Sequence, residues 1–214
     1  MKPHNYAVIF LPFVIILSNF ALLLFSDSFF HERFDRYGAY DKLGKVVADK
    51  ELDGLQHYFV SSEETLQASL LSSKERIHML EVRDIIRLVL FLWVSISLLF
   101  LLSSLLHPQW SKVLWRGGLL VLPLLLLLYA FSFDFASNFV AFHQLFFQDS
   151  SWLLSSDSML ITLFPQQLFA DFVFVVLIRS LIVGGCCIAI GWFFQRFKSS
   201  NRRLFGRWIG FWKK

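Results

Sequence analysis

The sequence predicts an all-α integral membrane protein, a single domain built as a four-transmembrane-helix bundle with a small, mostly helical extracytoplasmic cap. Hydrophobic residues make up 56% of the 214 residues and charged residues only 17%. Soluble domains average roughly 45–50% apolar and about 25% charged residues. The apolar residues gather in four long blocks, each close to the length of about 20 residues that crosses a bilayer. A run of positive charge directly follows the last block.

The first predicted span, residues 5–26, contains no charged side chain. A secretory signal peptide is the competing interpretation. Its apolar region would be only about 7–15 residues long and would end at a cleavage site of small residues. Bulky Phe25, Phe29 and Phe30 stand where such a site would need small side chains. The block is therefore predicted to be an uncleaved membrane helix.

Three further spans follow at residues 88–106, 117–133 and 172–194. Pro123 lies inside the third span, where membrane helices tolerate proline and can kink. Arg179 is the one charged residue inside the fourth span. Four spans place both chain termini on the same side of the membrane.

Positive charge predicts which side that is. The last 19 residues, within the segment 195–214, carry seven Lys or Arg and no acidic residue, and the short turn 107–116 is also basic. By the positive-inside rule both are cytoplasmic, so residues 27–87 and 134–171 face outward together. Nucleic-acid binding is not predicted, since no recognition fold accompanies the basic tail.

The outward segment before the second span is predicted to be helical. The sequence Ser72-Ser73-Lys74-Glu75 fits a capping box, so a helix should begin near Ser73 and run unbroken into the second span. Apolar residues in 43–59 also have helical spacing, with Gly44 and Gly54 as predicted breaks.

His78 is the first candidate for chemistry. It lies ten residues before Leu88, and on a helix it shares one face with Glu75 and Glu81. A nearby carboxylate can hold the tautomer of an imidazole and raise its basicity. Taken alone, the residue also fits an ordinary interfacial histidine in a salt-bridged helix.

His143 is the second candidate, in a segment that continues outward from the third span. Phe139, Phe146 and Phe147 lie on the same helical face. Such surroundings desolvate an imidazole, which lowers its pKa and favours the neutral base. Simple aromatic packing is the alternative. Both histidines fall on the same side of the membrane at a similar depth, which favours a joint role.

Arg179 is the most costly residue to place in a bilayer, because an arginine there costs several kcal/mol unless it is paired or hydrated. It lies eight residues inward of Asp171. We expect it to face the bundle interior, with Asp134 as a candidate partner. It could contact a lipid headgroup or an ester carbonyl, or form a purely structural ion pair.

Several other chemistries lack a motif. The sequence contains no glycine-rich phosphate loop, no His-Glu-x-x-His and no Gly-x-Ser-x-Gly, so no metal and no soluble cofactor is predicted. A Ser-His-Asp arrangement stays open, because several serines lie near His143 and Asp157, although their spacing selects none of them. Those serines are at positions 150, 151, 155, 156 and 158.

Two stretches together resemble a known family. Residues 71–83, Leu-Ser-Ser-Lys-Glu-Arg-Ile-His-Met-Leu-Glu-Val-Arg, resemble the Glu-x-x-His-Met-x-Asp-Val signature of bacterial lipoprotein intramolecular transacylases. Residues 142–147, Phe-His-Gln-Leu-Phe-Phe, resemble the start of its second signature, which continues through Trp152, Asp157, Leu160, Ile161, Phe164, Pro165 and Phe169. One departure is Glu81, which stands where the family pattern has Asp.

The resemblance implies a function in the bacterial cytoplasmic membrane. Such enzymes move an acyl chain from the sn-2 glyceryl ester to the N-terminal cysteine amine of a diacylated lipoprotein, forming a lyso-form lipoprotein. His78 and His143 would be the catalytic residues, and membrane lipid would surround the substrate. Their imidazoles should lie within about 10 Å, the space that one ester and one amine would span. The implied site also contains orienting residues (Glu75, Glu81, Asp134, Asp157, Arg179) and a substrate pocket (Phe139, Phe142, Phe146, Phe147, Trp152, Phe164).

Two other functions stay open. Another membrane acyl-ester enzyme, a serine hydrolase or acyltransferase, would use one of the serines in 150–158. A non-enzymatic subunit that binds lipid or lipoprotein would not need either histidine.

Overall fold

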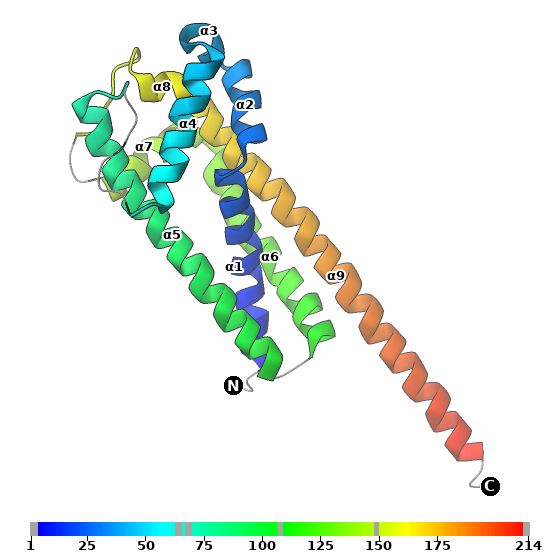
Figure 1. The fold of residues 1–214 in the computed structure, drawn as a ribbon. Helices are drawn as coiled ribbons and strands as arrows, with labels where there is room; N and C mark the ends of the chain where they lie inside the picture. The colour runs from blue at the N-terminus through cyan, green and yellow to red at the C-terminus, as the bar shows by residue number, and fades with distance from the viewer. Residues whose placement is uncertain (1–3, 63–65, 67–69, 107–108, 148–149, 212–214) are drawn as a thin grey trace. The chain divides into compact units, whose positions relative to one another are not determined.

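The computed structural model describes residues 4–62, 66, 70–106, 109–147 and 150–211, in which helices are joined by turns and short loops. No strand occurs in these residues, and the all-α prediction is confirmed. The helices, labelled in Figure 1, are α1 (His4–Leu24), α2 (Asp27–Arg36), α3 (Ala39–Leu43), α4 (Lys45–Val60), α5 (Ser73–Leu106), α6 (Trp110–Phe133), α7 (Phe135–Phe146), α8 (Met159–Leu163) and α9 (Gln166–Phe211).

Four of the helices, α1, α5, α6 and α9, are long and apolar enough to cross a membrane. Two of them run well beyond the spans that the sequence predicts. α5 has 34 residues and begins at Ser73, as the capping box predicts. At about 1.5 Å per residue it is roughly 50 Å long, more than the hydrocarbon core requires. The first turns of α5 and α9 therefore belong to the predicted outward segments. Residues 107 and 108 of the predicted turn and residues 212–214 of the tail lie outside the described residues.

Glycine breaks the helices at only one of the two predicted positions. Gly44 has a φ of 78° and caps the N-terminus of α4, a conformation that glycine adopts without steric cost. Gly54, by contrast, lies inside α4. The predicted break there is wrong, because a single glycine costs a helix only about 1 kcal/mol and the apolar face of α4 is buried on both sides of it.

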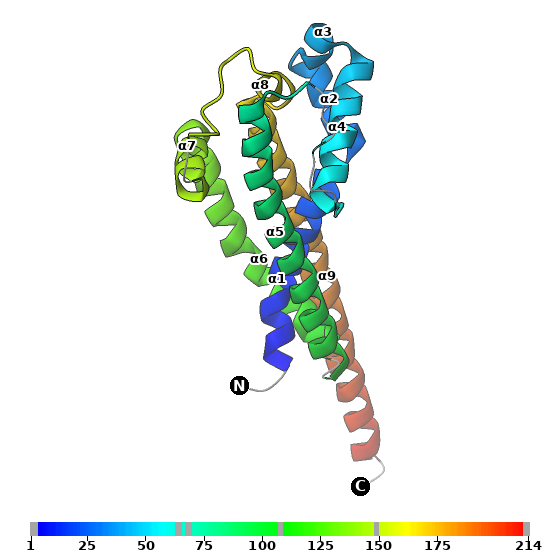
Figure 2. The ribbon, with the colours of Figure 1, turned by 60° about the vertical axis from the view of Figure 1, so that its left-hand side comes forward.

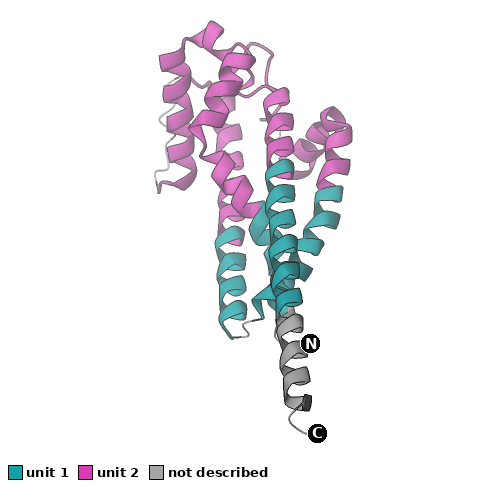
Figure 3. Cartoon of the chain, turned by 90° about the vertical axis from the view of Figure 1, so that its right-hand side faces the viewer, with its two compact units in different colours: residues 1–16, 93–126, 178–214 teal, residues 17–92, 127–177 magenta. Residues whose placement is uncertain are grey.

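The chain divides into two compact units, coloured in Figure 3. Unit 1 comprises residues 1–16, 93–126 and 178–214. Its helices approach closely at glycines, as is common in membrane proteins. A Cβ on Gly191 would lie 2.4 Å from the backbone nitrogen of Trp115, and one on Gly118 would lie 2.8 Å from the Ile188 side chain. Gln195 donates a hydrogen bond of 2.9 Å to the Ser111 carbonyl oxygen.

Unit 2 comprises residues 17–92 and 127–177 and contains both candidate histidines. In it α3 packs against α2, α4 and α8, and the views of Figures 1 and 2 agree that α2, α3 and α4 lie side by side. Aromatic rings fill the space between α2 and the α8 region. The ring of Phe164 lies 6.0 Å from that of Phe30 and 5.7 Å from that of Phe34.

A second contact in unit 2 joins α2 to the start of α9. The Asp171 carboxylate accepts hydrogen bonds from Arg33 Nε (3.1 Å), Arg36 (3.3 Å) and the Tyr37 hydroxyl (3.0 Å). Glu32 forms ion pairs with both arginines, at 2.6 Å and 2.9 Å. We call these five residues the Asp171 cluster. It fastens α2 to the first turns of α9 through charged hydrogen bonds, which are among the strongest that proteins make.

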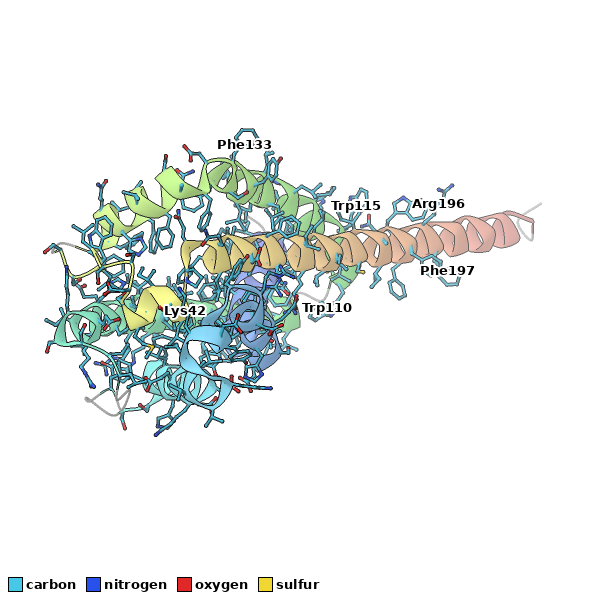
Figure 4. All side chains as sticks on the ribbon, turned by 90° about the horizontal axis from the view of Figure 1, so that it is seen from above. Lys42, Trp110, Trp115, Phe133, Arg196 and Phe197 are labelled. Atoms are coloured by element: carbon cyan, nitrogen blue, oxygen red, sulfur yellow. The ribbon has the colours of Figure 1, made fainter. Side chains whose placement is uncertain are left out.

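The long helices expose large apolar side chains, as a lipid-facing surface requires. Phe133 is 83% exposed, and Figure 4 shows its ring pointing away from α6. Arg179 is also exposed, so the expectation that it faces the bundle interior is wrong. The buried face of α9 follows Phe172, Val176 and Ser180, and Arg179 falls beside it. A long guanidinium side chain can snorkel toward a membrane surface from such a position.

Candidate active site

The helix that carries His78 is fixed at its first turn. The backbone N–H of Ser72 donates to Glu75 Oε2 at 2.7 Å, and the N–H of Glu75 donates to Ser72 Oγ at 3.3 Å. This reciprocal pair is the predicted capping box. His78 follows one turn later on α5, and its side chain is buried, with 8% of the residue exposed.

Glu75, which we expected to orient His78, accepts hydrogen bonds from backbone donors, and its role toward His78 stays a prediction. Its second oxygen, Oε1, accepts a hydrogen bond of 2.9 Å from the backbone N–H of Leu160 in α8. Both carboxylate oxygens are therefore engaged with backbone donors. Glu75 joins the start of α5 to α8, and the imidazole turns instead toward the next acidic residue of the same helix.

His143 lies on α7, a helix that is separate from α6. Asp134 ends the run of α6 and caps α7, because its carboxylate accepts a hydrogen bond of 3.3 Å from the N–H of Ser137. The sequence-based expectation of Asp134 as the partner of Arg179 is replaced by this capping role. The cap turns the chain so that His143 becomes a buried residue of α7.

The tautomer of His143 follows from its hydrogen bond. Its Nδ1 lies 2.7 Å from the backbone oxygen of Phe139. A carbonyl oxygen can only accept, so Nδ1 carries the proton and Nε2 keeps a lone pair. Burial lowers the pKa of His143 below its ordinary value, and the hydrogen bond to Phe139 offsets this only in part. The predicted neutral imidazole is therefore favoured at neutral pH.

The imidazole rings of His78 and His143 lie next to each other. Their ring centroids are 5.8 Å apart and the ring planes are inclined by 31°, which confirms the expected separation of less than about 10 Å. The Phe147 ring touches both, at 4.7 Å from His78 and 5.2 Å from His143. We call His78 and His143 the histidine pair.

Aromatic rings surround the histidine pair, but not all the predicted ones. The centroids of Phe139, Phe142 and Trp152 lie 4.3 Å, 5.6 Å and 5.3 Å from that of His143. Phe146 packs on Phe142 at 4.7 Å and is 50% exposed. Phe164 belongs to the separate cluster with Phe30 and Phe34. Among the ring contacts of the described residues none joins Phe164 to either imidazole, and its place in a substrate pocket stays a prediction.

Glu81 and Ser151 complete the surroundings of His78. Glu81 Oε2 lies 3.9 Å from His78 Nδ1, within ion-pair range but beyond hydrogen-bond range. The same oxygen accepts a hydrogen bond of 2.5 Å from Ser151 Oγ, and Ser151 is 5% exposed. Sequence reasoning counted Ser151 only among five possible nucleophiles. No local signal singles it out, because its partner lies 70 positions away along the chain.

The loop that carries Ser151 and Trp152 is attached to α5. Lys74 Nζ donates a hydrogen bond of 2.5 Å to the Leu153 carbonyl oxygen. Farther along, Asp157 is fully exposed, and a hydrogen bond from Ser155 lowers the pKa of its carboxyl group. Among the contacts of the described residues none joins Asp157 to either imidazole. In that part of the chain no group of three His, Cys, Asp or Glu side chains could hold a metal ion.

The sequence and the fold agree with one family. Residues 5–169 match the family model described as lipoprotein intramolecular transacylase Lit. Similar in fold is the solved structure of the membrane-integral lipoprotein intramolecular transacylase from Bacillus cereus, with a TM-score of 0.76, 16% identity and coverage of 94% of this chain and 96% of that chain.

Two further structures of the Bacillus cereus protein carry a single histidine replacement. The variant with arginine has a TM-score of 0.77, 18% identity and coverage of 93% of each chain. The variant with alanine has a TM-score of 0.78, 17% identity and coverage of 92% of this chain and 94% of that chain. No curated protein matches the sequence. These TM-scores show a shared fold, and the family match spans most of the sequence. This multi-pass membrane protein belongs to the lipoprotein intramolecular transacylase (Lit) family.

Proposed function

We propose that this chain transfers an acyl group within a diacylated lipoprotein, from the sn-2 glyceryl ester to the amine of the N-terminal cysteine, with the histidine pair as acid and base. The observation that carries this proposal is the 5.8 Å separation of two buried imidazoles inside a ring of aromatic side chains. The family of the chain supplies the reaction class, and the pair supplies the groups that such a reaction requires.

His143 is the proposed base. The reacting amine is protonated near neutral pH, since an α-amino group has a pKa of about 8. It first releases a proton to solvent, and the neutral amine then loses a second proton as it attacks the ester carbonyl. The Nε2 lone pair of His143 can take that proton, because Nδ1–H is held by the Phe139 carbonyl and burial keeps the ring neutral.

His78 is the proposed acid. Attack of the amine on the ester carbon forms the C–N bond, and the C–O bond to the glyceryl oxygen then breaks. The departing alkoxide needs a proton, which a protonated His78 donates. The Glu81 carboxylate, 3.9 Å from His78 Nδ1, stabilises the protonated ring by its charge. Starting from the ammonium form, the nitrogen loses two protons, one to solvent before attack and one to His143 as the C–N bond forms. The alkoxide gains one from His78, so one proton is released per turnover and no other reactant is needed.

The orientation of the substrate and the exclusion of water supply the rest of the catalysis. Amine and ester belong to the same substrate, and well-oriented intramolecular reactions reach very high effective molarities. Phe142, Phe147 and Trp152 form an apolar wall against the imidazoles. Such a wall would hold acyl chains and keep water from the ester, which favours transfer over hydrolysis. Membrane lipid and the lipoprotein substrate are the proposed partners.

The proposed setting is the outer leaflet of the bacterial cytoplasmic membrane, with both termini in the cytoplasm. The basic tail and the basic turn 107–116 support this orientation by the positive-inside rule. Residues 27–87 and 134–171, which contain the histidine pair, would then face outward.

A serine nucleophile has less support. The buried Ser151 hydroxyl donates to a carboxylate, not to an imidazole, and Asp157 is exposed. An activated catalytic serine donates its hydroxyl to an imidazole instead. The wild-type protein should consequently form no acyl-enzyme at Ser151, and Ser151→Ala should not abolish transfer.

The test is mass spectrometry of a diacylated lipoprotein after co-expression with this chain. Intact mass should stay unchanged, while fragmentation should place one acyl group on the N-terminal amine. His143→Ala, made to the same protein level, should leave the amine free. An unmodified amine beside well-folded wild-type protein would contradict the proposal. Transfer that survives in both His78→Ala and His143→Ala would favour a non-enzymatic role for the pair.

A further inference from the structure

The Glu81 carboxylate has two neighbours that compete for one of its oxygens. Oε2 accepts the hydrogen of Ser151 Oγ at 2.5 Å and lies 3.9 Å from His78 Nδ1. The first distance is that of a short, charge-assisted hydrogen bond, and the second is too long for one. The carboxylate is thus held by the serine and acts on the imidazole through its charge.

Ser151 is built into this position. It is 5% exposed, and the two residues that follow it in the loop also contact the site. Trp152, the next residue, packs on His143 at 5.3 Å, and the Leu153 carbonyl accepts a hydrogen bond from Lys74, one turn before His78 on α5. The loop therefore contacts the elements of both histidines, and its serine is directed at Glu81.

We infer that Ser151 is a positioning residue: its hydroxyl holds the Glu81 carboxylate back from His78, so that the carboxylate stabilises the charged imidazole without forming a direct hydrogen bond to it. A direct hydrogen bond from His78 Nδ1 to the carboxylate would stabilise the protonated ring further. His78 would then donate its proton less readily to the leaving alkoxide. This role rests on the proposed function for its catalytic meaning, while the contact itself is independent of it.

The effect of the Ser151 hydroxyl on His78 can be measured without substrate. Without the hydroxyl, the carboxylate loses a donor and can rotate toward Nδ1. The charged form of His78 then gains stability, and the midpoint of its protonation rises. Among the described residues, His143 from α7 also contacts the His78 ring. Ser151→Ala leaves this titratable group in place.

The experiment is an NMR pH titration of the full-length protein in nanodiscs, with nitrogen-15 in its histidine rings and His78 assigned by a His78→Gln variant. In Ser151→Ala the His78 midpoint should rise by about one pH unit, in line with the effect of opposite charges within roughly 4–6 Å. Ser151→Thr, which keeps the hydroxyl, should stay at the wild-type midpoint. Glu81→Gln should lower it, and Ser156→Ala, at an exposed serine of the same loop, is the matched control.

An unchanged midpoint in Ser151→Ala, with Glu81→Gln shifted as expected, would overturn the inference and leave Ser151 as a space-filling residue. If the alanine variant does not fold, Ser151→Cys replaces it, and a smaller rise is expected because a thiol is a weak donor. A second measurement separates this inference from the proposed function. A shifted midpoint in a protein that transfers no acyl group would reject the transacylase mechanism but keep the positioning role.

Discussion

The Asp171 cluster and the histidine pair lie in the same unit and both join a carboxylate to nitrogen-bearing side chains, but their contacts differ. Asp171 accepts three hydrogen bonds of 3.0–3.3 Å from two arginines and a tyrosine. Arginine stays protonated at any physiological pH. In the histidine pair the partners can gain and lose protons, the carboxylate stands 3.9 Å from the ring, and aromatic side chains replace further donors.

This difference distinguishes the Asp171 cluster, a structural contact, from the histidine pair, a proposed reaction centre. Fixed charges in direct contact hold two helices together and have no proton to move near neutral pH. An imidazole can change its protonation state within the physiological range, and burial together with the Phe139 carbonyl keeps His143 neutral near pH 7. The same unit therefore combines a rigid support with a site for acid–base chemistry, and substitutions in the two clusters should have separable effects.

The largest effect is expected from His143→Ala. Removing a general base from a reaction that must deprotonate an amine should lower the transfer rate by about 10²–10⁴-fold, with little change in thermal stability. Rates are measured in proteoliposomes containing a diacylated lipopeptide, and folding is checked by thermal unfolding in detergent. Leu145→Ala, at a position of the same helix that is 76% exposed, is the matched control. A large loss of stability without a loss of rate per folded molecule would reverse the assignment of the two clusters.

Acid should come next in magnitude. Burial lowers the pKa of His143, so the neutral base persists to below the ordinary histidine value of about 6.5. The transfer rate should fall about tenfold for each pH unit below that lowered pKa. Between the two values the unfolded chain binds more protons than the folded one, so acid also destabilises the fold. An acid limb that begins above pH 7 would contradict a desolvated base.

Asp171→Ala should act on stability alone. It removes the acceptor of three hydrogen bonds and leaves the largely buried Arg33 with Glu32 as its ion-pair partner. We expect the free energy of unfolding to fall by about 1–3 kcal/mol, measured by denaturation in detergent, and the transfer rate per folded molecule to remain. The control is Asp35→Ala, an exposed residue of α2. A rate loss matching that of His143→Ala would show that the two clusters are not separable.

The sequence predicts the local features of this protein well. The capping box predicts the start of α5 at Ser73, and apolar runs predict four membrane helices, since both depend on neighbours within a few positions. The surroundings of His143 are predictable for the same reason, as Phe139 and Phe147 lie one turn away. The resemblance to known signatures singles out both histidines.

Contacts between distant segments are what the sequence does not reveal. Glu75 has helical spacing to His78, but it binds the backbone of Leu160, 85 positions away. Ser151 reaches Glu81 across 70 positions. Arg179 has an acidic candidate partner in the sequence, yet helix periodicity places it on the exposed side of α9. Each outcome depends on which elements pack together, and no spacing rule within one segment contains that information.

A double-mutant cycle tests whether the two imidazoles serve one reaction centre. Transfer rates in proteoliposomes are measured for the wild type, His78→Gln, His143→Gln and the double variant. Residues that act as a unit are strongly non-additive, so the double variant should be no slower than the slower single variant. Independent, multiplying losses would show that the histidines do not act as a unit, and undiminished transfer in the double variant would contradict the account outright.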